Sequence, residues 1–298
     1  MSKLALINKV ALAGVMFFTV ILAGGHLSNA WQSDADDNLT YYADPFNKLN
    51  LTAKAAVLYD PEKNEIIYAK NAYAPMPLAS ITKVMTALVA SNLAGDNAGV
   101  TVSAEDLKTE GDSGLSRDEA WSLKNLIDFT LISSSNDGAT SLAAAAGATN
   151  FIEEMNKEAT DIGLTQTKFN NPTGLDLSPG VAGSTGSALD VARLIAYILK
   201  TKPELLAATS EKQAVITSES DLRHFAVNTN ELAGRLPGLF ASKTGFTDTA
   251  GGNLAVAVDV GLNQPVIAVV LGSTEEGRFA DVEALINTAR GDNYLIKR

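Results

Sequence analysis

Segments with the composition of β-strands lie near both ends of the chain, and the segments between them have helical patterns. The first two strand-like runs are residues 54–60 and 65–70, which are rich in Val, Ile and Tyr and predict a β-hairpin. The last two are residues 254–260 and 265–271, which are nearly continuous apolar runs. This arrangement predicts an α/β (α+β) fold with one antiparallel sheet built from both termini, flanking helices and an inserted helical lobe.

Five segments are expected to be helical: residues 80–93, 122–132, 150–162, 187–199 and 279–289. The first two have apolar residues three and four positions apart, which is the spacing of one helix face. The third begins like a capping box and is followed by Gly163, and the fourth is closed by Pro203. Most of these segments lie in the middle of the chain, where the helical lobe is expected.

The composition limits the chemistry that the chain can perform. It contains no cysteine, which excludes disulfides, a thiolate nucleophile, Cys-based zinc sites and a lipoprotein anchor. The two histidines, His26 and His224, are too few for a histidine-rich metal site. Because His26 lies in the N-terminal apolar segment, a Ser-His-Asp triad would have to use His224, and a surface or helix-end histidine is the simpler interpretation. No metal or other cofactor is therefore expected.

The charge of the chain argues against two classes of partner. Its formal net charge is −11, from 23 basic and 34 acidic residues. Proteins that bind nucleic acid through the phosphate backbone need a basic surface, so no nucleic-acid partner is expected. The acidic body is equally unsuited to an anionic membrane surface.

The first 30 residues have the pattern of a secretory signal. Lys3 and Lys9 flank an apolar run at residues 10–25, and Ser28 and Ala30 are small residues at the −3 and −1 positions of a cleavage site. The run is short for a membrane span, although it could remain as an uncleaved anchor. In either case the body is expected outside the cytoplasm, with membrane contact only through residues 1–30.

The expected domain organisation has four parts. Residues 1–30 are a signal peptide or anchor, and residues 31–50 are a polar, acidic linker without sustained periodicity. Residues 51–290 form the folded domain, and residues 291–298 are a short C-terminal tail.

Three short motifs carry the candidate chemistry: Ser80-Ile81-Thr82-Lys83, Ser134-Ser135-Asn136 and Lys243-Thr244-Gly245. At positions i and i+3 of a helix, Ser80 and Lys83 lie on one face, so the amine can reach the hydroxyl. Each of the first two motifs is expected roughly once by chance in a chain of this size, and the third in about one chain in fifteen. Together, in this order, they match the motif set of class A β-lactamases and penicillin-binding proteins.

On these motifs the chain resembles the low-molecular-mass penicillin-binding proteins, the D-alanyl-D-alanine carboxypeptidases. The resemblance runs from about residue 53 to residue 289 and includes residues 77–86, 131–137, 151–156, 169–175 and 243–251. It implies a penicillin-binding-protein/β-lactamase-like fold. It also implies a D-Ala-D-Ala carboxypeptidase that removes the terminal D-alanine from peptidoglycan stem pentapeptides and is acylated by β-lactams. Such an enzyme would act on the cell wall and cell shape, in the periplasm or at the outer face of the bacterial cytoplasmic membrane.

The expected nucleophile is Ser80, which would form the acyl-enzyme. A serine hydroxyl needs an adjacent base, and Lys83 is the candidate because no suitable histidine is available. Lysine can act as a base only if its pKa falls by several units from about 10.4, through burial or a second cation. The resemblance implies that Lys243 supplies that cation, and the N-terminus of the helix at Ser80 adds positive potential.

The resemblance implies roles for the other motif residues. Ser134 would relay a proton to the leaving amine, and Asn136 would hold the substrate backbone and the Lys83 amine. Backbone N–H groups of Ser80 and Phe246 would bind the oxyanion.

Substrate binding is expected along the Lys-Thr-Gly strand. Gly245 would leave the edge strand free for the peptide to pair with it. Thr244, Lys243 and Arg278 would bind the terminal carboxylate, with a surface salt bridge as the simpler interpretation of Arg278.

Three alternative functions share this motif set or this fold. Class A β-lactamases use an additional glutamate, but residues 170–186 contain none, and the context of Asp176 does not support that role. Slow turnover or lasting acylation by penicillin is therefore expected.

The chain stops at Arg298 without a second β-rich domain, as in the endopeptidase branch that cuts cross-links, whereas the Asn-Asp-Gly-Ala sequence after Ser135 favours the carboxypeptidase branch. A catalytically silent wall-binding protein is disfavoured because Ser80, Lys83 and the other motif residues are intact.

Overall fold

The computed structural model describes residues 44–95, 98–111, 113–261 and 263–291. The chain divides into two units, residues 1–43 and 44–298, and all described residues belong to the second. The expected signal or anchor at residues 1–30, most of the expected linker and most of the C-terminal tail lie outside the described residues. None of the described helices combines the length and apolar composition that a membrane-spanning helix needs.

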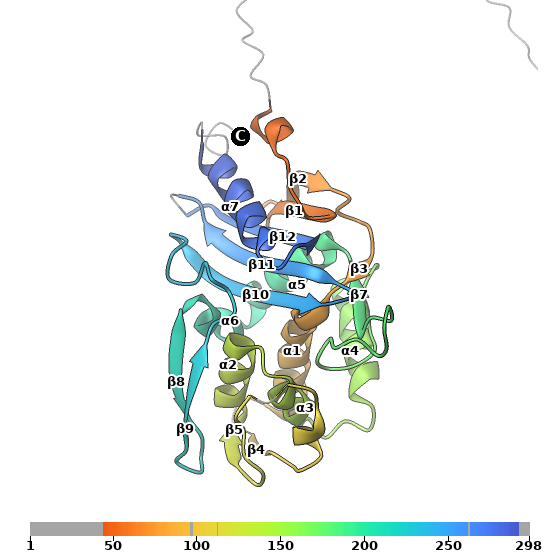
Figure 1. Ribbon diagram of the computed structural model, residues 1–298, viewed down its shortest axis with the longest axis vertical. Coiled ribbons are helices and arrows are strands. Elements are labelled where there is room, and N and C mark those ends of the chain that lie inside the picture. The colour runs from red at the N-terminus through yellow and green to blue at the C-terminus, as the bar shows by residue number, and fades with distance from the viewer. Residues whose placement is uncertain (1–43, 96–97, 112, 262, 292–298) are drawn as a thin grey trace, which may run out of the picture. The chain divides into compact units, whose positions relative to one another are not determined.

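The central element is a five-stranded antiparallel sheet with the strand order β10-β11-β12-β1-β2. Its strands are β1 (Ala55–Asp60), β2 (Glu65–Lys70), β10 (Leu239–Thr247), β11 (Gly251–Asp259) and β12 (Pro265–Ser273). Strand β1, from the start of the domain, pairs with β12, from its end, with Ala55 opposite Leu271. The predicted sheet built from both termini is therefore confirmed (Figure 1).

Both faces of this sheet are covered, which explains why its central strands are continuously apolar. In β12, Ile267, Val269 and Leu271 belong to the larger core beneath the helical lobe. The alternate residues Val266, Ala268 and Val270 belong to a smaller core under α7 (Gly277–Arg290). Because successive side chains in a strand point to opposite faces, a strand buried on both sides needs apolar residues at every position.

The helical lobe is inserted between β2 and β10 and covers the face of the sheet opposite α7 (Figure 1). Its α-helices are α1 (Thr82–Ala94), α2 (Leu123–Ser133), α3 (Asn136–Ala145), α4 (Phe151–Ile162), α5 (Ala188–Thr201) and α6 (Glu204–Ala207). Residues 82–91 of α1 are all buried, because neighbouring elements surround this helix on every side. Its polar residues Thr82, Lys83 and Thr86 are buried as well and hydrogen-bond to neighbouring segments.

Short elements connect these helices. The 3-10 helices are η1 (Pro45–Lys48), η2 (Ala79–Ile81), η3 (Asp106–Lys108) and η4 (Ala208–Ser210). The short strands form three small sheets: β3 (Met76–Pro77) with β7 (Ser184–Gly186) and β6 (Lys168–Phe169), β4 (Gly99–Thr101) with β5 (Ala120–Ser122), and β8 (Gln213–Thr217) with β9 (Arg223–Val227).

The predicted helix ends agree with the capping contacts. The side chains of Ser122, Asn150 and Ser187 accept hydrogen bonds from backbone N–H groups of α2, α4 and α5. Gly163 ends α4 in the left-handed conformation, as expected for a C-terminal glycine.

Three features differ from the sequence expectations. Ser80 lies in η2, two residues before the start of α1, and not at the start of the α-helix itself. Helix α3 was not predicted, because its first residues Asn136, Asp137 and Gly138 are poor helix formers. The β8–β9 hairpin was not predicted either, although its strands contain the β-branched and aromatic residues typical of strands. Helix α7 begins at Gly277, so Arg278 lies in its first turn and not ahead of it.

Candidate active site

The predicted nucleophile lies in a tight turn before α1. Ala79, directly before Ser80, has a φ of 48°, a left-handed conformation that costs a residue with a Cβ about 1–3 kcal/mol. Contacts on both sides hold this conformation: Thr82 Oγ1 donates to Ala79 O at 2.7 Å, and Ile81 N donates to Leu78 O at 3.3 Å. The turn places the Ser80 hydroxyl beside the first residues of α1.

The Lys83 side chain is fully buried and surrounded by oxygen atoms. Its Nζ lies 2.8 Å from Ser80 Oγ, 2.6 Å from Asn136 Oδ1 and 2.8 Å from Thr173 O. Burial, and to a lesser extent the charge of Lys243, lowers the pKa of Lys83 well below its ordinary value. The contact expected between Lys83 and Ser80 is therefore present, and burial favours the neutral form of this amine.

Asn136 is positioned by the junction of α2 and α3. Ser134 at this junction has a φ of 62°, and Ser135 caps α3 by accepting a hydrogen bond from Gly138 N at 2.9 Å. The Asn136 amide nitrogen donates to Glu110 O at 2.7 Å. This bond assigns the orientation of the amide, because it leaves the oxygen facing Lys83.

Lys243 projects from β10 toward the same junction. Its Nζ donates to Ser134 Oγ at 2.8 Å and to Thr244 O at 3.0 Å. Burial, followed by the charge of Arg278, lowers the pKa of Lys243 to about 7. The first and second motifs thus meet at Lys83, and the second and third meet at Lys243.

Gly245 permits β10 to lie against the nucleophile turn. A Cβ at this position would be 2.7 Å from Leu78 O and 3.2 Å from Ser80 N. The strand is at the edge of the sheet, as the predicted pairing with a peptide requires. The close approach is a second reason for glycine here, and sequence reasoning did not identify it.

Two other predicted binding residues have partners within the protein. Thr244 Oγ1 lies 2.5 Å from Thr229 Oγ1. Arg278 Nη1 donates to Gly245 O at 3.0 Å, and the Arg278 side chain is buried. Among the described residues, Arg278 Nε has no hydrogen-bond partner. Burial lowers the pKa of Arg278.

A cavity of about 610 Å³ lies beside the end of β10. Phe246, which is 44% exposed, and Thr247 line it on the strand side. Leu175 and Asp176 line it from the loop that precedes β7. Asp176 accepts hydrogen bonds from Thr247 Oγ1 and Thr249 N, so it links this loop to the strand.

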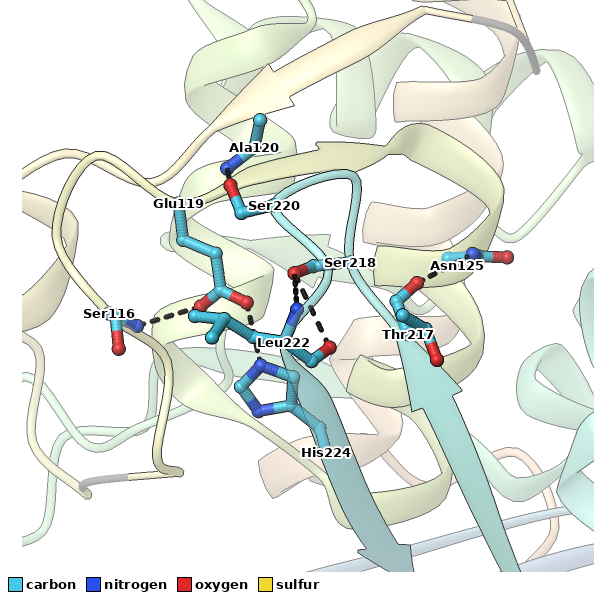
Figure 2. A network of polar contacts seen from close by, with 9 residues as sticks. All are labelled: Ser116, Glu119, Ala120, Asn125, Thr217, Ser218, Ser220, Leu222 and His224. Atoms are coloured by element: carbon cyan, nitrogen blue, oxygen red, sulfur yellow. Dashed lines mark hydrogen bonds and ion pairs between the residues drawn. The ribbon is translucent and has the colours of Figure 1, made fainter.

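His224 is not part of the Ser80 group. It lies in β9, where its ring packs against Trp121 and Phe129, and its Nε2 is 2.6 Å from Glu119 Oε1. Figure 2 shows the polar contacts around Glu119 and His224, which join β9 to the segment before β5. The histidine is therefore neither a triad member nor a helix-end residue, and its partly covered side chain makes a structural contact.

Sequence reasoning missed three contributors to the site: Glu110, Thr173 and Thr229. Glu110 and Thr173 act through their backbone carbonyl groups. Every residue has such a group, so the residue type does not indicate this role. The stretch that contains Thr173 had been matched to the family, but without a role. Within the described ranges, no three His, Asp or Glu side chains are grouped as metal ligands would be.

Comparison with known proteins agrees with this geometry. A profile of the D-alanyl-D-alanine carboxypeptidase family matches residues 42–275. The chain belongs to that family. This carboxypeptidase-family chain is 32% identical over 247 residues to the D-alanyl-D-alanine carboxypeptidase DacF of Bacillus subtilis. That alignment covers 80% of this chain and 62% of the relative. It is also 30% identical over 244 residues to a D-alanyl-D-alanine endopeptidase of Escherichia coli, covering 79% of the chain and 76% of the relative.

A solved structure supports the fold of this family member. The crystal structure of Penicillin-Binding Protein D2 from Listeria monocytogenes in the ampicillin-bound form aligns with a TM-score of 0.71 and 30% identity. The alignment covers 80% of this chain and 98% of that one. The predicted penicillin-binding-protein fold is therefore confirmed.

Proposed function

We propose that the chain is a serine D-Ala-D-Ala carboxypeptidase that removes the terminal D-alanine from peptidoglycan stem pentapeptides. The observation that carries this proposal is the buried Lys83 amine, which has a lowered pKa and lies 2.8 Å from Ser80 Oγ. A serine hydroxyl is a weak nucleophile until an adjacent base takes its proton. Lys83 meets that need without a histidine.

In the acylation step, Ser80 Oγ attacks the carbonyl carbon of the penultimate D-alanine and its proton passes to Lys83. The backbone N–H groups of Ser80 and Phe246 bind the oxyanion, and such donors contribute about 3 kcal/mol each. The close approach of Gly245 to Ser80 N supports this assignment, because it brings the two donor segments together.

Release of D-alanine requires a proton on the leaving nitrogen as the C–N bond breaks. Ser134 relays to this nitrogen the proton that Lys83 took from Ser80, and its hydrogen bond with Lys243 orients its hydroxyl. Water then attacks the acyl ester; its hydroxyl group goes to the carbonyl carbon and its proton returns to Ser80 Oγ. Asn136 holds the Lys83 amine in both steps.

The terminal carboxylate of the substrate binds near Lys243, Thr244 and Arg278. Lys243 and Arg278 are both buried, and the positive charge of Arg278 lowers the pKa of Lys243. An incoming carboxylate relieves this repulsion and offers an acceptor to the guanidinium group. These cations therefore support an anionic ligand at the strand.

The same chemistry makes β-lactams acylating inhibitors. Acylation by penicillin is expected to be long-lived, because residues 170–186 contain no glutamate to activate a deacylating water. The carboxylate that is present, Asp176, is engaged with Thr247 and Thr249. The ampicillin-bound Listeria structure supports β-lactam binding by this fold.

A second candidate function is D,D-endopeptidase activity on peptidoglycan cross-links. It is favoured by the similarity to the endopeptidase of Escherichia coli. Both reactions would use the same acyl-enzyme and would differ in the leaving group. A catalytically silent wall-binding protein would need no lysine beside Ser80 that can accept a proton. The lowered pKa of Lys83 therefore disfavours this alternative.

The proposed site of action is outside the cytoplasm, in the periplasm or at the outer face of the cytoplasmic membrane. The signal-like pattern of residues 1–30 supports export, and the peptidoglycan substrate lies in that compartment.

The test is covalent labelling of the purified chain with a fluorescent penicillin. We expect label on the parent and on Ser116→Ala, an exposed serine outside the site, and no label on Ser80→Ala. Absence of label on folded parent protein would favour the silent wall-binding alternative. If the parent is labelled, release of D-alanine from a pentapeptide would support the carboxypeptidase, and release of peptides from a cross-linked dimer alone would support the endopeptidase.

A further inference from the structure

A turn at residues 171–175 lies behind the Lys83 amine and is organised by one side chain. Asn171 Oδ1 accepts hydrogen bonds from Gly174 N at 2.7 Å, Thr173 N at 3.2 Å and Thr173 Oγ1 at 3.2 Å. Asn171 Nδ2 donates to Leu175 O at 2.8 Å. Asparagine is suited to this position because its amide can bond to backbone groups two and three residues ahead.

The turn is also held against the nucleophile segment. Thr86 Oγ1, from α1, donates to Pro172 O at 2.6 Å. Gly174 has a φ of +80°, and a Cβ there would lie 1.9 Å from Ala79 O. The turn therefore packs on the residue before Ser80, where only glycine fits, and it presents the Thr173 carbonyl to Lys83 at 2.8 Å.

The hydrogen-bonding capacity of the amine determines what this carbonyl does. A neutral primary amine has two N–H donors and one lone pair. Asn136 Oδ1 and the Thr173 carbonyl can only accept, because the Asn136 amide nitrogen is already bonded to Glu110 O. When both N–H groups are used in this way, the lone pair faces the remaining neighbour, the Ser80 hydroxyl.

We propose that Asn171 is a positioning residue for the general-base step: by holding the 171–175 turn, it places the Thr173 carbonyl so that the lone pair of Lys83 points at Ser80. This inference rests on the proposed function. As Ser80 Oγ bonds to the carbonyl carbon, the hydroxyl proton moves onto this lone pair. The resulting ammonium group then donates its three N–H groups to the same three oxygen atoms.

The inference is tested by the acylation kinetics of Asn171→Ala, with Asn170→Ala as the matched control. Asn170 is the adjacent residue in the same loop, is exposed, and bonds to Ala182 O at 3.3 Å. The full chain is mixed with a chromogenic penicillin, and the acylation rate constant and the noncovalent dissociation constant are separated by stopped flow. We expect the rate constant of Asn171→Ala to fall by about 10- to 100-fold, because a small misplacement of a reacting group has an effect of this size. The dissociation constant should stay within about twofold of the parent, and Asn170→Ala should match the parent in both.

The pH profile gives a readout that a merely structural role would not change. Loss of the Thr173 acceptor destabilises the ammonium form of Lys83 more than the neutral form, since hydrogen bonds from charged groups are the stronger ones. The acid limb of the acylation profile should therefore move to lower pH in Asn171→Ala. Asn171→Asp can still accept the three bonds and loses only the bond to Leu175 O, so its plateau rate should fall less than that of Asn171→Ala.

The outcomes separate this inference from the function on which it rests. If the parent is not acylated, the proposed function fails. If the parent is acylated and folded Asn171→Ala has the parental rate constant and pH profile, the positioning role is overturned. If Asn171→Ala does not fold, Thr86→Val takes its place, because it removes the bond from α1 to the turn with little change of shape. A parental rate and profile in Thr86→Val would likewise overturn the inference.

Discussion

Two buried lysines in the site have different surroundings. Lys83 is enclosed by acceptors, and burial, followed by the charge of Lys243, lowers its pKa well below the ordinary value. The pKa of Lys243 is lowered to about 7. Burial therefore favours the neutral, basic form of the Lys83 amine, while near neutral pH Lys243 still carries charge in a large part of the molecules. This division suits a reaction that needs a base and a cation within one cleft.

The pH dependence of carboxylate binding follows from Lys243. The free protein holds the Lys243 proton below about pH 7 and loses it above, so attraction for an anionic ligand weakens as the pH rises. We expect the second-order rate constant for acylation by penicillin to decline between about pH 7 and 9. In Lys243→Arg, whose guanidinium stays charged across this range, the decline should be absent even if the rate itself is lower. A parent profile that is flat over the range would contradict the assignment of Lys243 as the cation.

At the scale of elements, the site is assembled from a turn, a helix junction and an edge strand. Each supplies one motif, and each is held by contacts outside the motifs. The β8–β9 hairpin precedes the segment that contains Thr229, which bonds to both Ile132 O and Thr244. The Glu119–His224 pair ties this hairpin to the segment before β5 (Figure 2). Through these contacts His224 supports the β10 strand, although it lies outside the Ser80 group.

His224→Gln is expected to lower stability without changing chemistry. Burial raises the pKa of Glu119, while hydrogen bonds from Ser116, Ser218 and His224 lower it, and the net effect is a pKa below the ordinary value. Such a group stabilises the fold above its unfolded pKa, and this contribution is lost as the pH falls through the folded pKa. The variant should therefore lose about 1–3 kcal/mol near neutral pH and less near pH 4, measured by urea unfolding.

The acylation rate constant of folded His224→Gln should equal that of the parent. A loss of acylation by 100-fold or more in folded protein, on the order seen when a catalytic base is removed, would indicate that this histidine takes part in the reaction.

At the scale of the whole domain, the two ends of the chain close one sheet. Asp281, in α7, accepts hydrogen bonds from Thr52 N and Ala53 N at 2.8 Å and from Ser273 Oγ at 2.7 Å. One carboxylate therefore joins the segment before β1 to the end of β12 and to the last helix. Because α7 and the helical lobe cover opposite faces of the same sheet, loss of these hydrogen bonds should destabilise the packing on both faces.

Asp281→Ala is expected to lower the free energy of unfolding by about 3 kcal/mol, because it leaves three donors without their acceptor. The measurement is urea unfolding followed by circular dichroism and by tryptophan fluorescence in a Trp31→Phe background, which leaves Trp121 in the helical lobe as the reporter. Both signals should shift together to lower urea. A shift in one signal alone would show that the two sides of the sheet unfold independently, and a change below about 0.5 kcal/mol would contradict the closing role.

Much of the fold could be predicted because its signals are local. The hairpins at both ends have apolar runs separated by turn residues, and the caps at Ser122, Asn150 and Ser187 are short side chains with a preferred backbone partner. Helix α3 has a weak local signal, because it begins with the poor helix formers Asn136, Asp137 and Gly138. The β8–β9 hairpin has strand-type residues on both sides of a polar turn, and this local signal was missed.

By itself, the sequence determined the family, the fold class and the candidate catalytic side chains, because the order and composition of the three motifs are properties of the chain. The tertiary structure alone decided how those side chains are oriented. The Asn136 amide faces Lys83 because Glu110 supplies a carbonyl, and Lys83 has a second acceptor because the Asn171 turn supplies another. Backbone carbonyls are the same in every residue, so only folding shows which of them reach the site.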